Sequence, residues 1–95
     1  TAMGYGALDA NTTADNNTAV GYSALTANTT GTQNIAVGSL AGDAITTGSY
    51  NIAIGHEALS ASTTDDSNTA VGNNALKVAS GGAHNTAVGS ASLRS

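Results

Sequence analysis

A glycine recurs every 17 residues along the whole chain, and no insertion or deletion interrupts the series. The recurring residues are Gly4, Gly21, Gly38, Gly55, Gly72 and Gly89. A fixed repeat length is typical of solenoids, in which each unit buries its apolar side against the next unit. We therefore expect residues 1–95 to form one repeat domain of about six 17-residue coils, as a segment of a longer fibre.

The residues before each glycine have the alternation of a β-strand. Positions three and one before the glycine hold Thr, Ile, Val or Met, and the position two before it always holds Ala. The position four before it holds Asn17, Asn34, Asn51, Asn68 and Asn85. In a strand, the β-branched positions share one face, and the Ala and Asn positions share the other. Because neither face carries a charge, we predict a strand that is buried on both sides.

An apolar pair follows most of the recurring glycines and predicts a second short strand. Ala and Leu stand three and four residues after the glycine in most repeats, as in Ala24-Leu25, and a small residue such as Ala27 continues the leucine face. The third repeat has Gly42 in place of this leucine. We expect its neighbours Leu40 and Ile45 to refill the same interior volume.

A polar arc connects this segment to the next Asn, and its Gly and Asp residues suit turns. The charged residues fall in the arc or just outside the predicted strands: Asp9, Asp15, Asp43, Glu57, Asp65, Asp66, Lys77 and Arg94. Charges confined to a few repeat positions mark the solvent face. The recurring glycine is then expected at a corner that needs positive φ or close backbone approach.

Stacking predicts both ladders and a partner chain. Coils stacked about 4.8 Å apart place equivalent residues in rows, so the Asn side chains can bond to one another, and Val, Ala and Leu form a thin core. Because so thin a core is marginal for a lone domain, we expect the Ala-rich face of the first strand to lie outside and to bury against another copy.

Composition excludes several classes of function. Lys77 and Arg94 are the only basic side chains, too few for the phosphate contacts of a nucleic-acid interface. No apolar run is long enough to insert in a membrane. Cysteine is absent, and no pattern suggests a cofactor. Leu, Ile and Val total only fifteen residues, which by itself favours disorder, but the strict repeat argues for a folded chain.

The unit N-[TI]-A-[VI]-G-x-x-A-L resembles the head repeats of trimeric autotransporter adhesins. The longer form NTAVGYSALTANTTG, residues 17–31, is similar to repeats of phage tail-fibre and related surface proteins. The resemblance implies a left-handed parallel β-roll, a parallel homotrimer, and a non-enzymatic structural segment of an extracellular fibre on a cell or virion surface. The alternative is an adhesin head that binds host matrix or glycans.

Candidate sites for metals and catalysis are weak. His56 and His84 occupy different repeat positions, so surface histidines are favoured over a repeated metal site. Asp15 and the pair Asp65-Asp66 hint at calcium, but other arcs lack the matching residues, which favours solvated turn carboxylates. No Ser, His and Asp form an evident catalytic set. The pairs Gly4-Gly6 and Gly81-Gly82 lack a phosphate-loop lysine and are interpreted as turn glycines.

Three further features leave alternatives open. Asn11, Asn16 and Asn28 begin N-glycosylation sequons, and glycosylation stays open for the arc. Stacked pairs such as Thr29-Thr30 favour a polar ladder, with an ice-binding surface as the lesser alternative. Neither end completes a repeat, so we expect either more coils in a longer chain or end-to-end contact between protomers in a filament.

Overall fold

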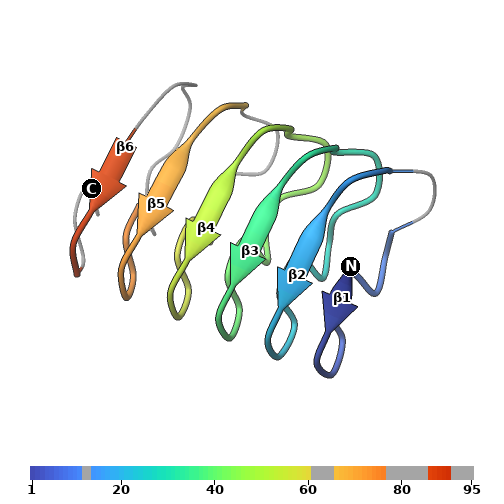
Figure 1. Ribbon diagram of the computed structural model, residues 1–95, viewed down its shortest axis with the longest axis horizontal. Coiled ribbons are helices and arrows are strands. Elements are labelled where there is room, and N and C mark those ends of the chain that lie inside the picture. The colour runs from blue at the N-terminus through green and yellow to red at the C-terminus, as the bar shows by residue number, and fades with distance from the viewer. Residues whose placement is uncertain (12–13, 61–65, 77–85, 91–95) are drawn as a thin grey trace.

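The computed structural model describes residues 1–11, 14–60, 66–76 and 86–90. Six short strands lie side by side in chain order in one sheet (Figure 1). They are β1 (Ala2–Met3), β2 (Thr18–Val20), β3 (Ile35–Val37), β4 (Ile52–Ile54), β5 (Thr69–Val71) and β6 (Thr86–Val88). None of the described residues is helical.

The sheet is parallel, and its register equals the sequence repeat. Ala19 pairs with Ala36, and Ala36 pairs with Ala53, so equivalent residues form straight rows across the strands. Each strand belongs to one coil, and the chain returns through a turn and an arc to the next strand (Figure 1). The prediction of an all-β solenoid with one coil per 17 residues is confirmed.

The faces of the strand differ from the prediction. The central alanines lie inside the coil: Ala19, Ala36, Ala53 and Ala70 are completely buried, and Ala87 nearly so. The β-branched residues on either side of them point outward, and several are exposed. Our expectation of an Ala-rich outer face, with valine inside, is therefore wrong. A 17-residue coil is narrow, and only a methyl group fits between the strand and the chain that returns behind it.

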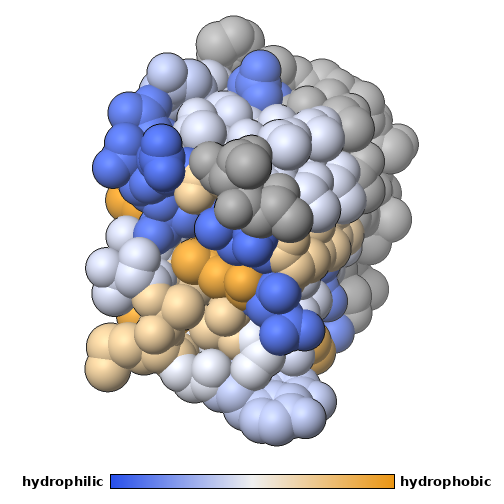
Figure 2. Space-filling view, turned by 90° about the vertical axis from the view of Figure 1, so that its right-hand side faces the viewer, coloured by the Kyte–Doolittle hydropathy of each residue, from blue (hydrophilic) through white to orange (hydrophobic). Residues whose placement is uncertain are grey.

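The core consists of these alanines and of large residues from the turn that follows the strand. Leu25, Leu59 and Leu76 are buried there, together with Ala24, Ala58 and Ala75. Seen from the β1 end, apolar residues occupy the middle of the cross-section and polar residues its upper edge (Figure 2). The interior thus holds about one large side chain per coil, as the composition suggested.

The glycine after each strand is a corner, as predicted. Gly38 has φ of 127°, in the region that side chains rarely adopt. A Cβ atom on Gly38 would lie 2.8 Å from the carbonyl carbon of Gly55 in the next coil. Both predicted reasons for glycine, positive φ and close backbone approach, therefore hold at this position.

The second strand is a wrong prediction for the described coils, because the segment is a run of tight turns. In the second coil the N–H groups of Ala24, Thr26 and Asn28 donate to the carbonyl groups three residues earlier, at 3.2–3.3 Å. Ser23 and Leu25 have φ of 56° and 51°. A positive φ at the third residue of a turn is the feature of type II turns. It recurs at every second residue, so the turns share the two-residue period of a strand.

The third coil confirms half of the predicted compensation. Gly42 takes the place of leucine and keeps the positive φ of that position, at 60°. Ile45 is buried, with its Cδ1 atom 3.1 Å from the point where a Cβ on Gly42 would lie. Ile45 thus fills the volume that leucine occupies in other coils, whereas Leu40 is only half-buried.

Candidate functional surfaces

The asparagines before each strand form a buried ladder that joins one coil to the next. The main-chain N–H of Asn34 donates to Oδ1 of Asn17 at 2.9 Å, and the same bond links Asn51 to Asn34. The Nδ2 group of Asn34 donates to the carbonyl oxygen of Gly48 in the arc, at 2.8 Å. The predicted side-chain-to-side-chain bonds are thus replaced by bonds to main chain. These residues hold the coils in register. Asn68 continues the ladder, and Asn85 lies outside the described residues.

A second buried asparagine, Asn28, is less well paired. Its Nδ2 group donates to the carbonyl oxygen of Gly31 at 3.0 Å, but Asn17 Nδ2 donates to the same oxygen at 2.8 Å. The Oδ1 atom of Asn28 is buried and has no hydrogen-bond partner. Because Asn28 is fully buried, its sequon does not present an amide at the surface, whereas Asn11 and Asn16 are exposed.

The outward side chains of the strands form a surface that we call the sheet face. Its two rows are Thr18, Ile35, Ile52, Thr69 and Thr86, and Met3, Val20, Val37, Ile54, Val71 and Val88. Among them, Met3, Ile35, Val37, Ile54 and Val88 are exposed. None of the six strands contains a charged residue. The molecule therefore presents a continuous, uncharged, largely apolar sheet to its surroundings.

The residues directly after the corner glycines form a second row, which we call the turn column and which is exposed at every position except Ser39. Its members are Tyr5, Tyr22, Ser39, His56, Asn73 and Ser90. The rings of Tyr5 and Tyr22 are stacked, with centroids 5.6 Å apart and planes 9° apart, and both are exposed. This pair was not predicted, although two tyrosines 17 residues apart in a solenoid have to lie in adjacent coils.

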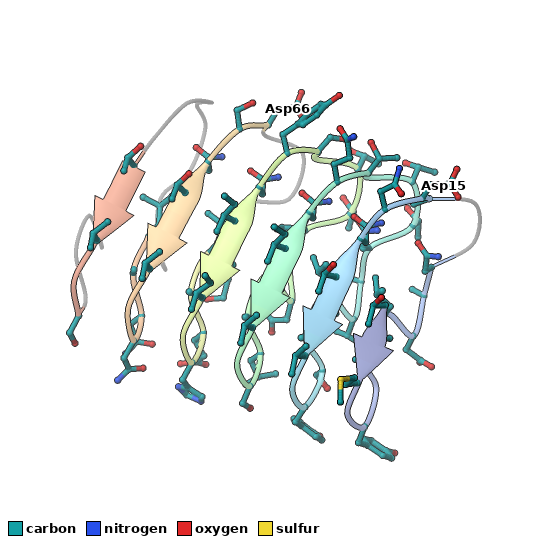
Figure 3. All side chains as sticks on the ribbon, viewed as in Figure 1. Asp15 and Asp66 are labelled. Atoms are coloured by element: carbon teal, nitrogen blue, oxygen red, sulfur yellow. The ribbon has the colours of Figure 1, made fainter. Side chains whose placement is uncertain are left out.

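The carboxylates suspected of binding calcium lie apart. Asp15 and Asp66 both lie on the arc side of the molecule, in different coils (Figure 3). Asp15, Thr32, Ser49 and Asp66 occupy one column, so three coil steps of about 4.8 Å separate the two carboxylates. Oδ1 of Asp66 accepts the main-chain N–H of Ser49 at 2.8 Å. Asp66 acts in a turn, and Asp65 lies outside the described residues.

The other candidate residues are scattered. His56 is exposed, and its Nδ1 atom lies 3.8 Å from Oε1 of Glu57. His84 lies outside the described residues. Within the described ranges, no three His, Asp or Glu side chains cluster as ligands for a metal ion. Gly4 and Gly6 have φ of 119° and 74°, as turn glycines do.

The threonine pairs split between two environments. Thr29 and Thr46 are half-buried, and Oγ1 of Thr29 donates to the carbonyl oxygen of Thr46 at 3.4 Å. Thr30 and Thr47 are exposed. In these two arcs the inner threonines form the predicted polar ladder, and the outer ones form a single exposed row. The pairs at 12–13 and 63–64 lie outside the described residues.

Comparisons of the chain with protein-family models, with curated proteins and with solved structures give no match. The described part of the chain has no helix that is both long and apolar enough to cross a bilayer.

Proposed function

We propose that this chain is a structural, non-catalytic segment of an extracellular fibre, on a cell or virion surface, built from parallel left-handed coils in a homotrimer. The observation that carries the proposal is the sheet face. Val37 and Ile54 are 37% and 38% exposed at the centre of a regular sheet, with no charge beside them on the strands. Large uncharged apolar patches on a soluble chain mark contact surfaces.

A second copy of the chain is the partner that fits this face. Each coil contributes two outward side chains, and the coils repeat in register. The face therefore has a spacing of about 4.8 Å along the axis, and only a surface with the same spacing packs against all of it. The sheet face of another copy has this spacing. The number three comes from the resemblance to adhesin head repeats.

The small interior gives a further reason for assembly. One large side chain per coil, as at Leu25 and Leu59, leaves a single chain with little apolar burial. Association through the sheet face adds a second apolar layer on the other side of each strand. The strand is then buried on both sides, as its lack of charge predicted. The exposed charges Asp9, Asp15 and Asp66 stay in the turns and arcs, at the surface of a polar fibre.

Sedimentation equilibrium tests the proposal directly. The chain is expected to have three times its formula mass at micromolar concentration. The double variant Val37→Lys, Ile54→Lys places two charges in the sheet face, and we expect it to sediment as a monomer. The matched control Thr30→Lys, Thr47→Lys adds the same charges at exposed positions of the arc and is expected to stay trimeric.

Two results decide against the proposal. A wild-type chain that is folded and monomeric at this concentration removes the homo-oligomer. If the sheet-face variant and the arc control dissociate equally, the contact between copies does not lie on the sheet face. If the wild-type chain sediments as a dimer, the proposed number of copies is wrong, but the sheet face is still the contact. Electron microscopy of the native material is expected to show long, thin particles.

An adhesin head that binds a matrix or glycan ligand is the second candidate function. One observation favours it: Tyr5 and Tyr22 are stacked in the open, in a row of otherwise small or polar residues. Exposed tyrosines are frequent in binding surfaces because they offer a rigid ring and a hydroxyl group at small entropic cost.

A further inference from the structure

The turn column holds rings on both sides of a short residue. Tyr22 precedes Ser39 by one coil, and His56 follows Ser39 by one coil. Tyr22 and the side chain of His56 are 55% and 54% exposed, and Ser39 is half-buried. One coil step is a stacking distance in this column, because the Tyr5 and Tyr22 centroids are 5.6 Å apart. The position above Ser39 is therefore where a third ring would stack.

Two coil steps separate the attachment points of Tyr22 and His56, about 9.6 Å at the usual strand spacing. A ring placed midway would lie about 4.8 Å from each neighbour, inside the range of about 4.5–7 Å in which stacked rings attract one another. Tyr5 covers one face of Tyr22 and holds its plane, so the opposite face of Tyr22 is presented toward this position. The chain itself places only a hydroxymethyl group there.

The polar groups around this position indicate which ring fits. Ser39 carries a hydroxyl group in this coil, His56 stands in the next coil of the column, and Oε1 of Glu57 lies 3.8 Å from Nδ1 of His56. A planar aromatic hydrocarbon uses none of these hydrogen-bonding groups. A pyranose has apolar C–H faces for the rings and a rim of hydroxyl groups for the polar side chains. The charged group beside this position is the Glu57 carboxylate, which repels an anionic sugar.

We propose that Tyr22, Ser39 and His56 form a binding site for a neutral pyranose, which stacks on Tyr22 in the place that the repeat leaves to Ser39. This site deepens the second candidate function and rests on it. It does not depend on how many copies assemble. Failure of the sedimentation test and failure of this one are therefore separate results.

Nuclear magnetic resonance titration of the full chain tests the site. The probes are methyl β-glucoside, methyl β-galactoside, methyl α-mannoside and chitotriose, and the readout is the ring signals of Tyr22 and His56. We expect one of these sugars to move both signals with a dissociation constant of about 1 mM, the level of a single stacked ring with a few hydrogen bonds. Tyr22→Ala is expected to weaken binding about tenfold, the effect of losing one stacked ring.

Ser39→Tyr is the sharper variant, since it fills the position with the chain's own ring and extends the Tyr5–Tyr22 stack. It is expected to abolish binding and to leave the fold intact. Tyr50→Ala removes an exposed tyrosine elsewhere and serves as the matched control. The site is overturned if no probe moves the two ring signals, if Ser39→Tyr binds like wild type, or if Tyr50→Ala weakens binding as much as Tyr22→Ala. Tighter binding of free indole than of every sugar also overturns it.

Discussion

The strand and corner of each coil and the polar arc behind them are built on different rules. At the corner, the same bond recurs in every described coil: the glycine N–H donates to the last strand residue of the preceding coil at 2.7–2.8 Å. The corner glycines Gly4 to Gly89 keep φ within 119–132°. This half of the coil is a copy of one structure, in which main chain bonds to main chain.

The arc also has one recurring main-chain bond, in which the N–H groups of Gln33, Tyr50 and Ser67 donate to carbonyl groups of the preceding coil at 3.0–3.3 Å, but its other bonds differ between coils. The N–H groups of Thr29, Thr30 and Gly31 all point to one carbonyl, that of Thr46, at 3.0–3.4 Å. At the next arc position the main-chain N–H donates to a side chain of the following coil, and the type of that side chain varies: Thr32 donates to Oγ of Ser49 at 3.0 Å, and Ser49 donates to Oδ1 of Asp66 at 2.8 Å. The arc thus adds side-chain acceptors to main-chain bonds, whereas the corner uses main-chain bonds alone. The difference teaches that the strand and corner fix the register, while the arc accepts sequence changes.

Gly38→Ala attacks the corner and has the largest expected effect. Positive φ costs about 2 kcal/mol for a residue with a side chain, and overpacking against the Gly55 main chain costs about 2 more. We expect a loss of about 4 kcal/mol in the free energy of unfolding, which is much of the stability of a small domain. Urea denaturation at fixed protein concentration measures it.

Gly89→Ala separates the two costs. Gly89 has nearly the same φ, 122°, but among the described residues no atom lies within 4 Å of an added Cβ. We expect only the backbone cost there, about 2 kcal/mol. Equal losses at the two sites would contradict the argument that the close approach of successive coils demands glycine.

The asparagine ladder joins the two regions, and Asn34→Ala breaks that joint. The substitution leaves the Asn51 N–H and the Gly48 carbonyl buried without their partners. We expect a loss of about 3 kcal/mol, the cost of two such groups. The same substitution at Asn28 is expected to change stability by at most about 1 kcal/mol, because the Gly31 carbonyl keeps Asn17 and the unpaired Oδ1 atom disappears. If thermal unfolding shows the same loss of stability for both variants, the number of broken hydrogen bonds does not determine the loss.

The sequence predicted the parts that repeat without change. The 17-residue glycine spacing predicted the coil length and the parallel register, and the β-branched positions predicted the strands. The corner role of Gly38 and the compensation by Ile45 also followed from residue type. These features recur in every repeat, so the six copies of the sequence pattern support each prediction six times.

The errors have two physical causes. Leu25 in the left-handed region is uncommon, and a run of turns with positive φ at every second residue has the period of a strand. Which face of the strand lies inside depends on the width of the coil, and alternation alone leaves that open. The structure was therefore needed to show that Ala36 points into the coil and Val37 points outward. The tyrosine stack could have been predicted from the sequence, because the 17-residue repeat places Tyr5 and Tyr22 at the same position of adjacent coils.

Gly31→Ala carries the comparison into the arc. A Cβ on Gly31 would overlap the carbonyl oxygen of Gly48, yet φ of Gly31 is not positive, so only the contact opposes the change. The same position holds Ala14 in the first arc. We expect a loss of about 2 kcal/mol, about half that of Gly38→Ala, because the arc shifts outward more easily than the corner. The control Thr30→Ala, at an exposed neighbour, should lie within about 0.5 kcal/mol of wild type. Calorimetry measures both losses of stability. A larger loss for Gly31→Ala than for Gly38→Ala would contradict the argument that the corner tolerates less change than the arc.

The smallest predicted effect is a gain, and it lies between the two regions, in the turn after the corner. Ser23 has φ of 56°, whereas the equivalent position of the first coil is Gly6. Ser23→Gly removes a left-handed penalty of about 1–2 kcal/mol. The greater freedom of glycine in the unfolded chain returns about 0.4–1 kcal/mol of this. A net gain of about 0.5–1 kcal/mol is expected, visible as a higher midpoint in urea. Ser23→Ala removes the same hydroxyl group but keeps a Cβ atom in the left-handed region, so it should show no gain. If both variants gain equally, the hydroxyl group and not the backbone is the cause, and the positive φ at this position is then free of strain.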